Sequence, residues 1–241
     1  MSKRFFVAEP VTGDSALLSG AEAEHVVKVL RGKVGDLVTL FDGDGAEFPA
    51  RITAVGRSSV ALAVLARQEV SRELKTQITL GVALPKGDRQ RWLVEKAVEL
   101  GVAQLVPLVT ERGVAEPNEA ALGRLRRYAI EAAKQCGRNR LLQIGSPQTF
   151  GEFARGANLA ALRLLAHPDS TAVPVAGLAW AGPAADVWCA VGPEGGFTEE
   201  ELAAADGWRR VSLGPRILRV ETAAVALAAW FSLCDAIRPG P

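Results

Sequence analysis

Histidine, cysteine and methionine are scarce in this chain of 241 residues, which holds two histidines, three cysteines and one methionine. The cysteines, Cys136, Cys189 and Cys234, lie far apart and form no Cys-x-x-Cys pair. This usage predicts reduced, buried thiols in a cytosolic protein rather than a disulfide framework. Because His25 and His167 are the only histidines, we expect no His/Cys metal site.

Long hydrophobic runs are also missing. The first ten residues, MSKRFFVAEP, contain no apolar stretch of the kind that a secretory signal requires. The most apolar stretch begins at Thr222, and Ser232 and Asp235 interrupt it before it reaches the length that spans a bilayer. We therefore expect a cytoplasmic protein without a membrane anchor.

The two common nucleotide-binding fingerprints are absent as well. No GxxxxGK[ST] loop occurs, and no GxGxxG follows the early strands. A metabolic α/β enzyme that binds nucleotides through such a loop is therefore disfavoured.

Charge is balanced overall, with a formal net charge of +1, but it is unevenly distributed. Residues 71–150 carry 13 basic and 8 acidic side chains, whereas the flanking regions carry more acidic than basic ones. A basic segment in a balanced protein is typical of binding to a phosphate backbone, although a set of solvated helix faces would give the same count.

The first seventy residues indicate a small β-rich domain. Two strand-like runs flank an Asp-Gly-Asp-Gly turn at residues 42–45, which predicts a hairpin. A short helix over residues 21–31 precedes it, and we expect Gly32 to close that helix. Several short strands with one helix suggest a barrel, followed by a polar linker at residues 68–77.

Strands and helices alternate after the linker, which predicts a parallel sheet with helices on both faces. Asp88 is the expected N-cap of a helix that ends at Gly101. Asn118 is the expected N-cap of the long basic helix. Ligands of such sheets collect at the carboxyl ends of the strands.

One such strand end, VGPEGGFTEEE, places Gly192, Gly195 and Gly196 between a strand and a helix. Thr198 and Glu201 have the spacing of a capping box, so the helix is expected to begin directly after Phe197. The glycines allow backbone amides to approach a ligand, or they serve a tight turn alone.

A second strand end, SLGPRILRVET, leads into the apolar C-terminal helix. Glu221 lies at the positive end of that helix, where a carboxylate is stabilised. Arg216 and Arg219 require carboxylates, phosphates or solvent, because burying an unpaired guanidinium is costly. Arg219 could pair with Glu194 or Glu221, or face a nucleic acid.

In this order and spacing, the two loops resemble those of bacterial 16S ribosomal RNA uridine-N3 methyltransferases. These enzymes belong to the knotted class that uses S-adenosylmethionine (SAM). RFFV, HVVKVLR, KGDRQRWLVEKAVELGV and EAAKQCGR match as well, so the resemblance covers nearly the whole chain.

The resemblance implies an RNA-binding PUA-like β-barrel over residues 1–70. It implies an α/β SAM-dependent methyltransferase domain with a C-terminal trefoil knot over residues 71–241. It further implies a homodimer formed through the knot and the C-terminal helix, and a substrate RNA within the assembled small ribosomal subunit.

The resemblance also implies roles for individual residues. Arg219 is expected to stabilise charge on the base, and Glu194 or Glu221 to accept a proton or to orient that arginine. No metal is expected. The expected SAM contacts are His167, Gly192, Pro193, Glu194, Gly195, Gly196, Leu213, Gly214, Ile217, Leu218, Arg219 and Thr222. The expected RNA contacts are Arg4, Lys28, Arg31, Lys86, Arg89, Arg91, Arg138 and Arg140.

Two rival functions remain open at this point. A related knotted methyltransferase would act on transfer RNA or on another ribosomal RNA site, but the N-terminal barrel and the KGD segment favour the uridine-N3 family. A non-catalytic RNA-binding assembly factor would not need intact cofactor loops, which this chain retains.

Overall fold

The computed structural model describes residues 3–115, 117–167, 169, 171–178 and 186–237. These residues form two compact units. The first unit comprises residues 1–73 and 130–141, and the second comprises residues 74–129 and 142–241. Residues 130–141 thus pack with the first unit, although they lie beyond the predicted boundary at residue 70.

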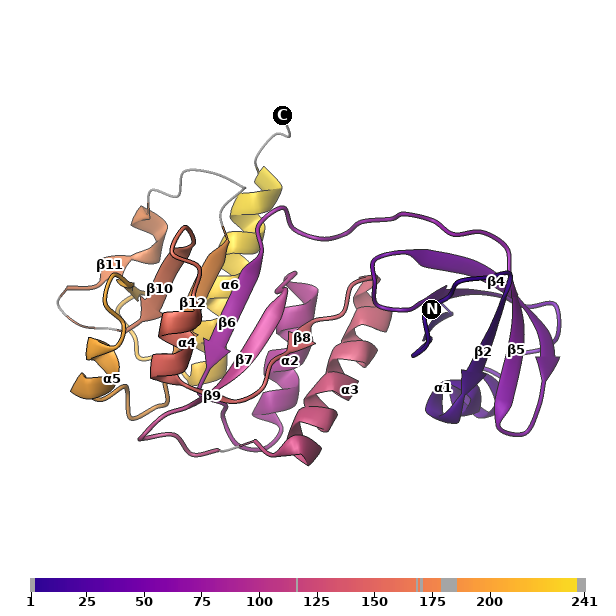
Figure 1. Ribbon diagram of the computed structural model, residues 1–241, viewed down its shortest axis with the longest axis horizontal. Coiled ribbons are helices and arrows are strands. Elements are labelled where there is room, and N and C mark those ends of the chain that lie inside the picture. Colours follow the sequence, from indigo (N-terminus) through magenta and orange to yellow (C-terminus); the bar gives the residue numbers. More distant parts are fainter. Residues whose placement is uncertain (1–2, 116, 168, 170, 179–185, 238–241) are drawn as a thin grey trace. The chain divides into compact units, whose positions relative to one another are not determined.

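The first unit is built on a five-stranded sheet with the order β1-β3-β4-β5-β2, and Figure 1 labels β4, β5 and β2 of this sheet. Strands β3, β4, β5 and β2 pair antiparallel, and β1 pairs parallel with β3. The predicted hairpin is confirmed, because β3 and β4 flank the Asp-Gly-Asp-Gly turn. The strands are β1 (Arg4–Phe6), β2 (Ser15–Ser19), β3 (Leu37–Phe41), β4 (Glu47–Val55) and β5 (Ser59–Val64).

The predicted helix of the first unit has two parts. Helix α1 (Gly20–Glu24) continues into a π-helical turn, η1 (His25–Val29). The segment ends at Arg31, which adopts the left-handed conformation with φ at 51°. The sequence had predicted that Gly32 would take this role. Gly32 is needed for a different reason: a Cβ there would lie 2.7 Å from Val26 Cγ1.

The second unit contains a parallel sheet with the order β11-β13-β10-β12-β6-β7-β8, and β9 pairs with β7. All five residues of β6 are buried, as expected for a central strand covered on both faces. The strands are β6 (Ile78–Val82), β7 (Gln104–Val109), β8 (Gln143–Ile144), β9 (Gln148–Thr149), β10 (Leu162–Ala166), β11 (Val173–Pro174), β12 (Val187–Val191) and β13 (Arg209–Ser212).

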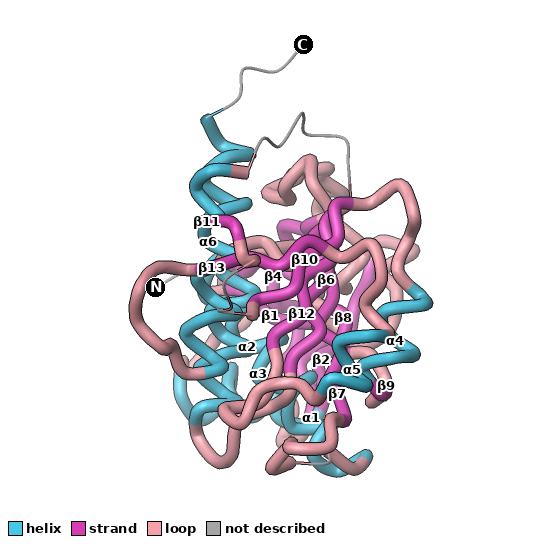
Figure 2. Tube along the Cα trace, turned by 90° about the vertical axis from the view of Figure 1, so that its left-hand side faces the viewer, coloured by secondary structure: helices cyan, strands magenta, loops and turns pink. Residues whose placement is uncertain are grey.

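Helices cover both faces of this sheet, as predicted. Figure 2 shows α2 and α6 on one side of the strands and α4 and α5 on the other. Helix α6 packs on β6 and β12, and α4 packs on β7 and β9. The helices are α2 (Arg89–Glu99), α3 (Glu119–Cys136), α4 (Phe150–Gly156), α5 (Glu199–Ala203) and α6 (Val220–Ile237), with a short 3-10 turn η2 (Val175–Gly177).

In the second unit, the predicted helix ends are confirmed with one exception. The Asn118 side chain accepts a hydrogen bond from the backbone N–H of Ala121 at 3.0 Å, and Thr198 and Glu201 form the expected capping box. Asp88 occupies the N-cap position of α2, but its side chain makes no capping hydrogen bond. Its backbone is already helical there, with φ at −64° and ψ at −17°, whereas a capping side chain is typical of an extended N-cap residue.

The three cysteines are free thiols, but only Cys189 is fully buried. Burial raises the pKa of the Cys189 thiol well above its ordinary value. Cys234 is half-buried and Cys136 is exposed, so the prediction of three buried thiols was wrong for Cys136, which lies at the last position of α3. Among the described helices, none is long and apolar enough to cross a membrane.

Gly81 in β6 tests the packing of the sheet against α4. A Cβ at this position would lie 2.6 Å from the ring of Phe153, which is itself fully buried. We expect Gly81→Ala to lower the free energy of unfolding by about 1–3 kcal/mol, the usual cost of overpacking a core. Urea denaturation followed by circular dichroism measures this change.

Gly123→Ala is the matched control, because Gly123 lies within α3 and a Cβ there meets no atom within 4 Å. This substitution should stabilise the protein by about 0.5–1 kcal/mol. Equal stability of the two variants would contradict the packing described here.

Candidate functional site

Three neighbouring strands of the second unit end at the same edge of the sheet. Strand β10 lies between β13 and β12, and Ala166 is paired with Val191 on one side and with Val211 on the other. Because the strands are parallel, the loops that follow them begin side by side. The two loops selected from the sequence are therefore brought together with the segment after β10, which carries the predicted SAM contact His167.

These loops enclose a cavity of about 410 Å³. Every predicted cofactor residue lines it except Thr222, which is exposed in the first turn of α6. The sequence did not predict the apolar lining of the cavity or the contribution of Arg216. Most of these residues lie at the ends of predicted strands or beside the predicted loops, and this position is the signal that could have indicated them. The additional lining residues are Ala166, Val191, Phe197, Val211, Arg216, Val220 and Ala223.

Glycine is required at two positions of the first loop for different reasons. A Cβ on Gly192 would lie 2.7 Å from the buried ring of Phe197, so the close approach of this ring excludes a side chain. Gly196 has φ at +72°, in the left-handed region that glycine tolerates, and its N–H donates to the carbonyl oxygen of Pro193 at 2.8 Å. The loop is therefore a tight turn that leaves room on its cavity side.

The loop after β7 supports this turn, which the sequence did not indicate. Arg112 Nη1 donates to the carbonyl oxygen of Gly195 at 2.8 Å, and the backbone N–H of Glu111 donates to Glu201 Oε1 at 3.0 Å. Gly195 accommodates the arginine stem, which lies 3.2 Å from the position that a Cβ would take. The glycine loop and the start of α5 are thus held from the β7 side.

Arg89, the first residue of α2, pairs with both candidate catalytic carboxylates. Its Nη1 lies 3.0 Å from Glu194 Oε1 and 3.5 Å from Glu221 Oε2. The sequence had assigned Arg89 to RNA and had suggested Arg219 as the partner of these glutamates. The structure corrects that pairing, because both carboxylates contact the guanidinium of Arg89.

The pKa of Glu194 lies below its ordinary value. The main cause is a hydrogen bond from its own backbone N–H; Arg89 lowers this pKa further and Arg219 adds a smaller effect, while partial burial opposes all three. Glu194 is therefore ionised at neutral pH and half-exposed, whereas Glu221 is buried.

Arg219 lines the cavity with an exposed side chain. Within the described part of the chain, its guanidinium makes no ion pair with a carboxylate. It is therefore a cation available at the cavity rather than part of an internal pair.

His167 also lines the cavity, next to a charged cluster. Its backbone N–H donates to the carbonyl oxygen of Val211 at 3.2 Å, and its ring lies 3.8 Å from Asp169. Asp169 has a pKa of about 2, chiefly because the Thr171 hydroxyl donates to it, with a further contribution from its ion pair with Arg210. His167 thus lines the cavity from the end of a strand, as the sequence suggested.

Comparisons with known proteins agree with this geometry. Residues 72–232 match the model of the RNA methyltransferase domain, and residues 18–65 match that of the RNA methyltransferase PUA domain. The ribosomal RNA small subunit methyltransferase E of Synechocystis is 35% identical over 237 residues, which cover 95% of this chain and 77% of the relative. This chain belongs to the ribosomal RNA small subunit methyltransferase E family.

Two solved structures extend the similarity to the fold. A protein of Legionella pneumophila, in complex with the bound cofactor SAM, has a TM-score of 0.89 and 33% identity. The ribosomal RNA small subunit methyltransferase E of Neisseria gonorrhoeae, bound to SAM, has a TM-score of 0.87 and 29% identity. Each alignment covers 97% of this chain and 98% of the other.

Eight cations were expected from the sequence to contact RNA, and the structure shows that two of them are internal. Arg4 is buried, with Nη1 2.8 Å from Glu47 and Nη2 2.6 Å from Asn139. Arg138 is buried against Glu73, with Nη2 2.5 Å from Oε2. Because these guanidiniums are occupied inside the first unit, we do not retain them as RNA contacts.

The other predicted cations lie closer to solvent. Lys28 pairs with Glu24 at 3.1 Å, and Arg91 pairs with Glu95 at 2.7 Å while lying over the ring of Tyr128. The remaining exposed members of the predicted set are Arg31, Lys86 and Arg140, and Arg89 is tied to the cavity as described above.

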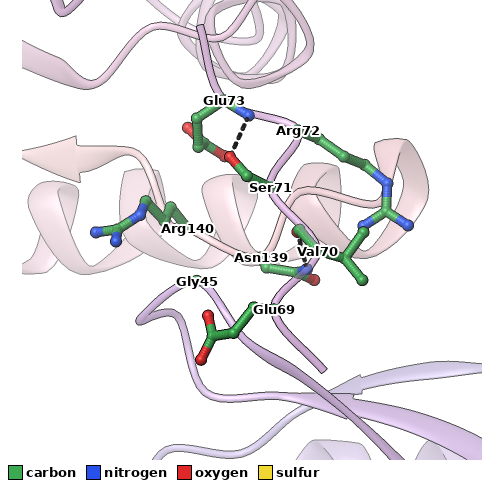
Figure 3. A pocket seen from close by; sticks show the side chains of 8 residues that line it. All are labelled: Gly45, Glu69, Val70, Ser71, Arg72, Glu73, Asn139 and Arg140. Atoms are coloured by element: carbon green, nitrogen blue, oxygen red, sulfur yellow. Dashed lines mark hydrogen bonds between the residues drawn. The ribbon is translucent and has the colours of Figure 1, made fainter. Parts of the chain in front are cut away.

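A smaller cavity of about 110 Å³ lies in the first unit. Figure 3 shows Arg72 and Arg140 on opposite sides of it, with their guanidiniums directed apart. Arg72 donates to Glu47 and to the carbonyl oxygen of Gly137, and Asn139 donates to the carbonyl oxygen of Val70. Much of the polar lining is thus engaged within the unit, which favours a structural role. Among the described residues, no cluster of metal-ligating side chains occurs.

Asp169 provides a test of the charged cluster beside His167. The pKa of Asp169 is about 2 in the folded protein and 3.8 ordinarily. The ionised Asp169 carboxylate therefore contributes its full stabilisation above pH 3.8, and this contribution is lost as the pH falls towards 2. We expect Asp169→Asn to be less stable than the wild type at pH 6, and this difference to shrink as the pH falls towards 3.

Urea midpoints at the two pH values measure this effect. Asp206→Asn is the control, because Asp206 is exposed and forms no ion pair within the described residues. A stability difference for Asp169→Asn that does not depend on pH would contradict the assignment of the ion pair.

Proposed function

We propose that the protein transfers the methyl group of SAM to N3 of a uridine in 16S ribosomal RNA. The observation that carries this proposal is the cavity at the three strand ends, which is built from the Gly-Pro-Glu-Gly-Gly loop and the loop of residues 213–219. Both structural relatives of this chain that are described above were solved with SAM.

The cavity fits a ligand of this kind in size and lining. A volume of about 410 Å³ lies within the roughly 300–1,000 Å³ usual for small-molecule sites. Apolar residues such as Val191, Phe197 and Val220 offer surface to an adenosine ring, and the glycine turns leave backbone polar groups accessible. Gly192, Pro193, Glu194, Gly195, Gly196, Leu213, Gly214, Ile217, Leu218, Arg219 and His167 are the proposed SAM contacts, and the exposed Thr222 is not retained as a wall residue.

When bound, SAM supplies an electrophilic methyl group, so the residues of the chain mainly position the acceptor nitrogen in line with it. Uracil N3 carries a proton at neutral pH and becomes nucleophilic as that proton leaves. We propose that Arg219 stabilises the negative charge that develops on the carbonyl oxygens of the base. Glu194 is a weak proton acceptor because its pKa is lowered, which favours a role in organising the arginines.

The RNA and the quaternary structure complete the proposal. Five exposed cations are proposed to meet phosphates of the 16S RNA in the assembled small subunit, namely Lys28, Arg31, Lys86, Arg91 and Arg140. A homodimer through a C-terminal knot and α6 would bury two apolar side chains that are exposed in the single chain: Leu233 at 63% and Ile217 at 93%. The site of action proposed with this substrate is the cytoplasm.

Product mapping tests the proposed function directly. Purified protein is incubated with labelled SAM and either intact small subunits or naked ribosomal RNA, and the modified nucleotide is identified by mass spectrometry. The proposal requires methyl on uridine N3. Methyl on a ribose oxygen or on a guanine would assign the protein to a different reaction.

Arg219→Ala tests the proposed catalytic cation. Since Arg219 is expected to act mainly in the transition state, SAM affinity should stay within about tenfold of wild type while turnover falls by about 10²–10³-fold. Calorimetry and single-turnover methylation measure the two quantities. Arg209→Ala removes an exposed arginine from β13 outside the cavity and should leave both unchanged. Wild-type turnover in Arg219→Ala would remove this residue from the mechanism.

A further inference from the structure

Arg89 joins three segments that are distant in the sequence. It begins α2, and its Nη1 contacts Glu194 from the glycine loop at 3.0 Å and Glu221 from the first turn of α6 at 3.5 Å. Arg219 sits two residues before Glu221 and lines the same cavity. Arg89 and Glu221 therefore lie next to the cavity residue Glu194, and among the described residues only Arg89 is paired with the two glutamates.

We infer that Arg89 is a positioning residue for methyl transfer: by engaging Glu194 and Glu221, it leaves the Arg219 guanidinium free to meet the RNA base. This inference rests on the proposed function. It differs from the RNA-phosphate role that the sequence suggested for Arg89, because the guanidinium is directed at carboxylates of the cofactor loops.

The charges at the site explain why this division matters. Glu194 is close enough to Arg219 for that arginine to lower the Glu194 pKa. Arg89 and Arg219 are the two arginines that lower the Glu194 pKa, so without Arg89 the ionised Glu194 carboxylate would attract Arg219 alone. An ion pair between them would occupy the guanidinium that the base requires, since a cation already paired stabilises a new negative charge less well.

Glu221 adds a second constraint. Its side chain is 8% exposed, and a buried carboxylate without a counter-charge is strongly disfavoured. The N-terminal position of Glu221 on α6 stabilises it in part, and Arg89 supplies the neighbouring positive charge. One arginine thus supplies the counter-charge to a carboxylate of the glycine loop and to a carboxylate at the start of α6.

Suppression of one variant by another tests the inference. We expect Arg89→Ala to lower turnover by about 10²-fold, the usual effect of losing one preorganised donor, with little change in the RNA KM. In Arg89→Ala/Glu194→Gln the competing carboxylate is absent, and turnover should return to within about tenfold of wild type. Because Glu194 is also a proposed SAM contact, Glu194→Gln alone serves as the reference, and the double variant should match its turnover at saturating SAM. Lys96→Ala, which removes a cation of α2 paired with Glu99, is the control and should match wild type.

A structural readout makes the test independent of turnover. In a crystal structure of Arg89→Ala, the Arg219 guanidinium should lie within about 4 Å of the Glu194 carboxylate, the usual ion-pair distance. If Arg89→Ala does not fold because Glu221 lacks its partner, Arg89→Lys takes its place. Lysine keeps the charge, so this variant should fold, and its remaining turnover defect should again be relieved by Glu194→Gln.

Three outcomes would overturn the inference. The first is that the double variant turns over no faster than Arg89→Ala. The second is that Arg219 remains apart from Glu194 in the crystal structure of Arg89→Ala. The third is that Arg89→Ala raises the RNA KM in a salt-dependent way and that Glu194→Gln does not restore its turnover. The last outcome would return Arg89 to the RNA contacts. Failure of the proposed function is distinguishable, because the wild-type protein would then produce no N3-methyluridine at all.

Discussion

The parallel register of β13, β10 and β12 is the constraint on which the site depends. It aligns Val211, Ala166 and Val191, so that the three loops which follow start at one edge of the sheet. None of the loops could enclose a ligand alone, and the glycine turn needs Phe197 beneath it and Arg112 beside it to keep its shape. The cavity is thus a product of strand order, and its chemistry comes from the side chains that the loops carry.

The local signals in the sequence were sufficient for much of this architecture. Alternating strands and helices predicted the parallel sheet, and Thr198 with Glu201 predicted the start of α5. Glycines marked the ligand loops, but their individual reasons could not be known beforehand. Gly192 is needed because of a contact with Phe197, whereas Gly196 is needed because of its positive φ. Sequence thus predicts where a turn lies, while packing decides which property of glycine the turn uses.

Contacts between distant segments could not be predicted in the same way. Arg89 is 105 residues from Glu194 and 132 from Glu221, and no periodicity links them. The basic composition of residues 71–150 is typical of RNA binding, and Arg138 was among the expected RNA contacts, yet Arg138 is neutralised by Glu73 within the first unit. A charge count cannot separate cations that face solvent from those that balance a buried carboxylate, because the partner is set by tertiary packing.

The balance of charges at the cavity has a consequence for how the enzyme must handle its substrate. In the proposed reaction, a uracil that loses its N3 proton needs a nearby positive charge, but an arginine beside an unpaired Glu194 carboxylate would form an ion pair before the RNA arrives. Dedicating one permanently charged guanidinium, that of Arg89, to the carboxylates resolves this conflict. Two Nη1 hydrogens can serve Glu194 and Glu221 at once, and the attached helix α2 fixes the group in place. Arg219 would then be preorganised by Arg89, a residue that does not contact the base. The chemistry of the site therefore depends on four charged residues, Arg89, Arg219, Glu194 and Glu221, as well as on the two glycine loops.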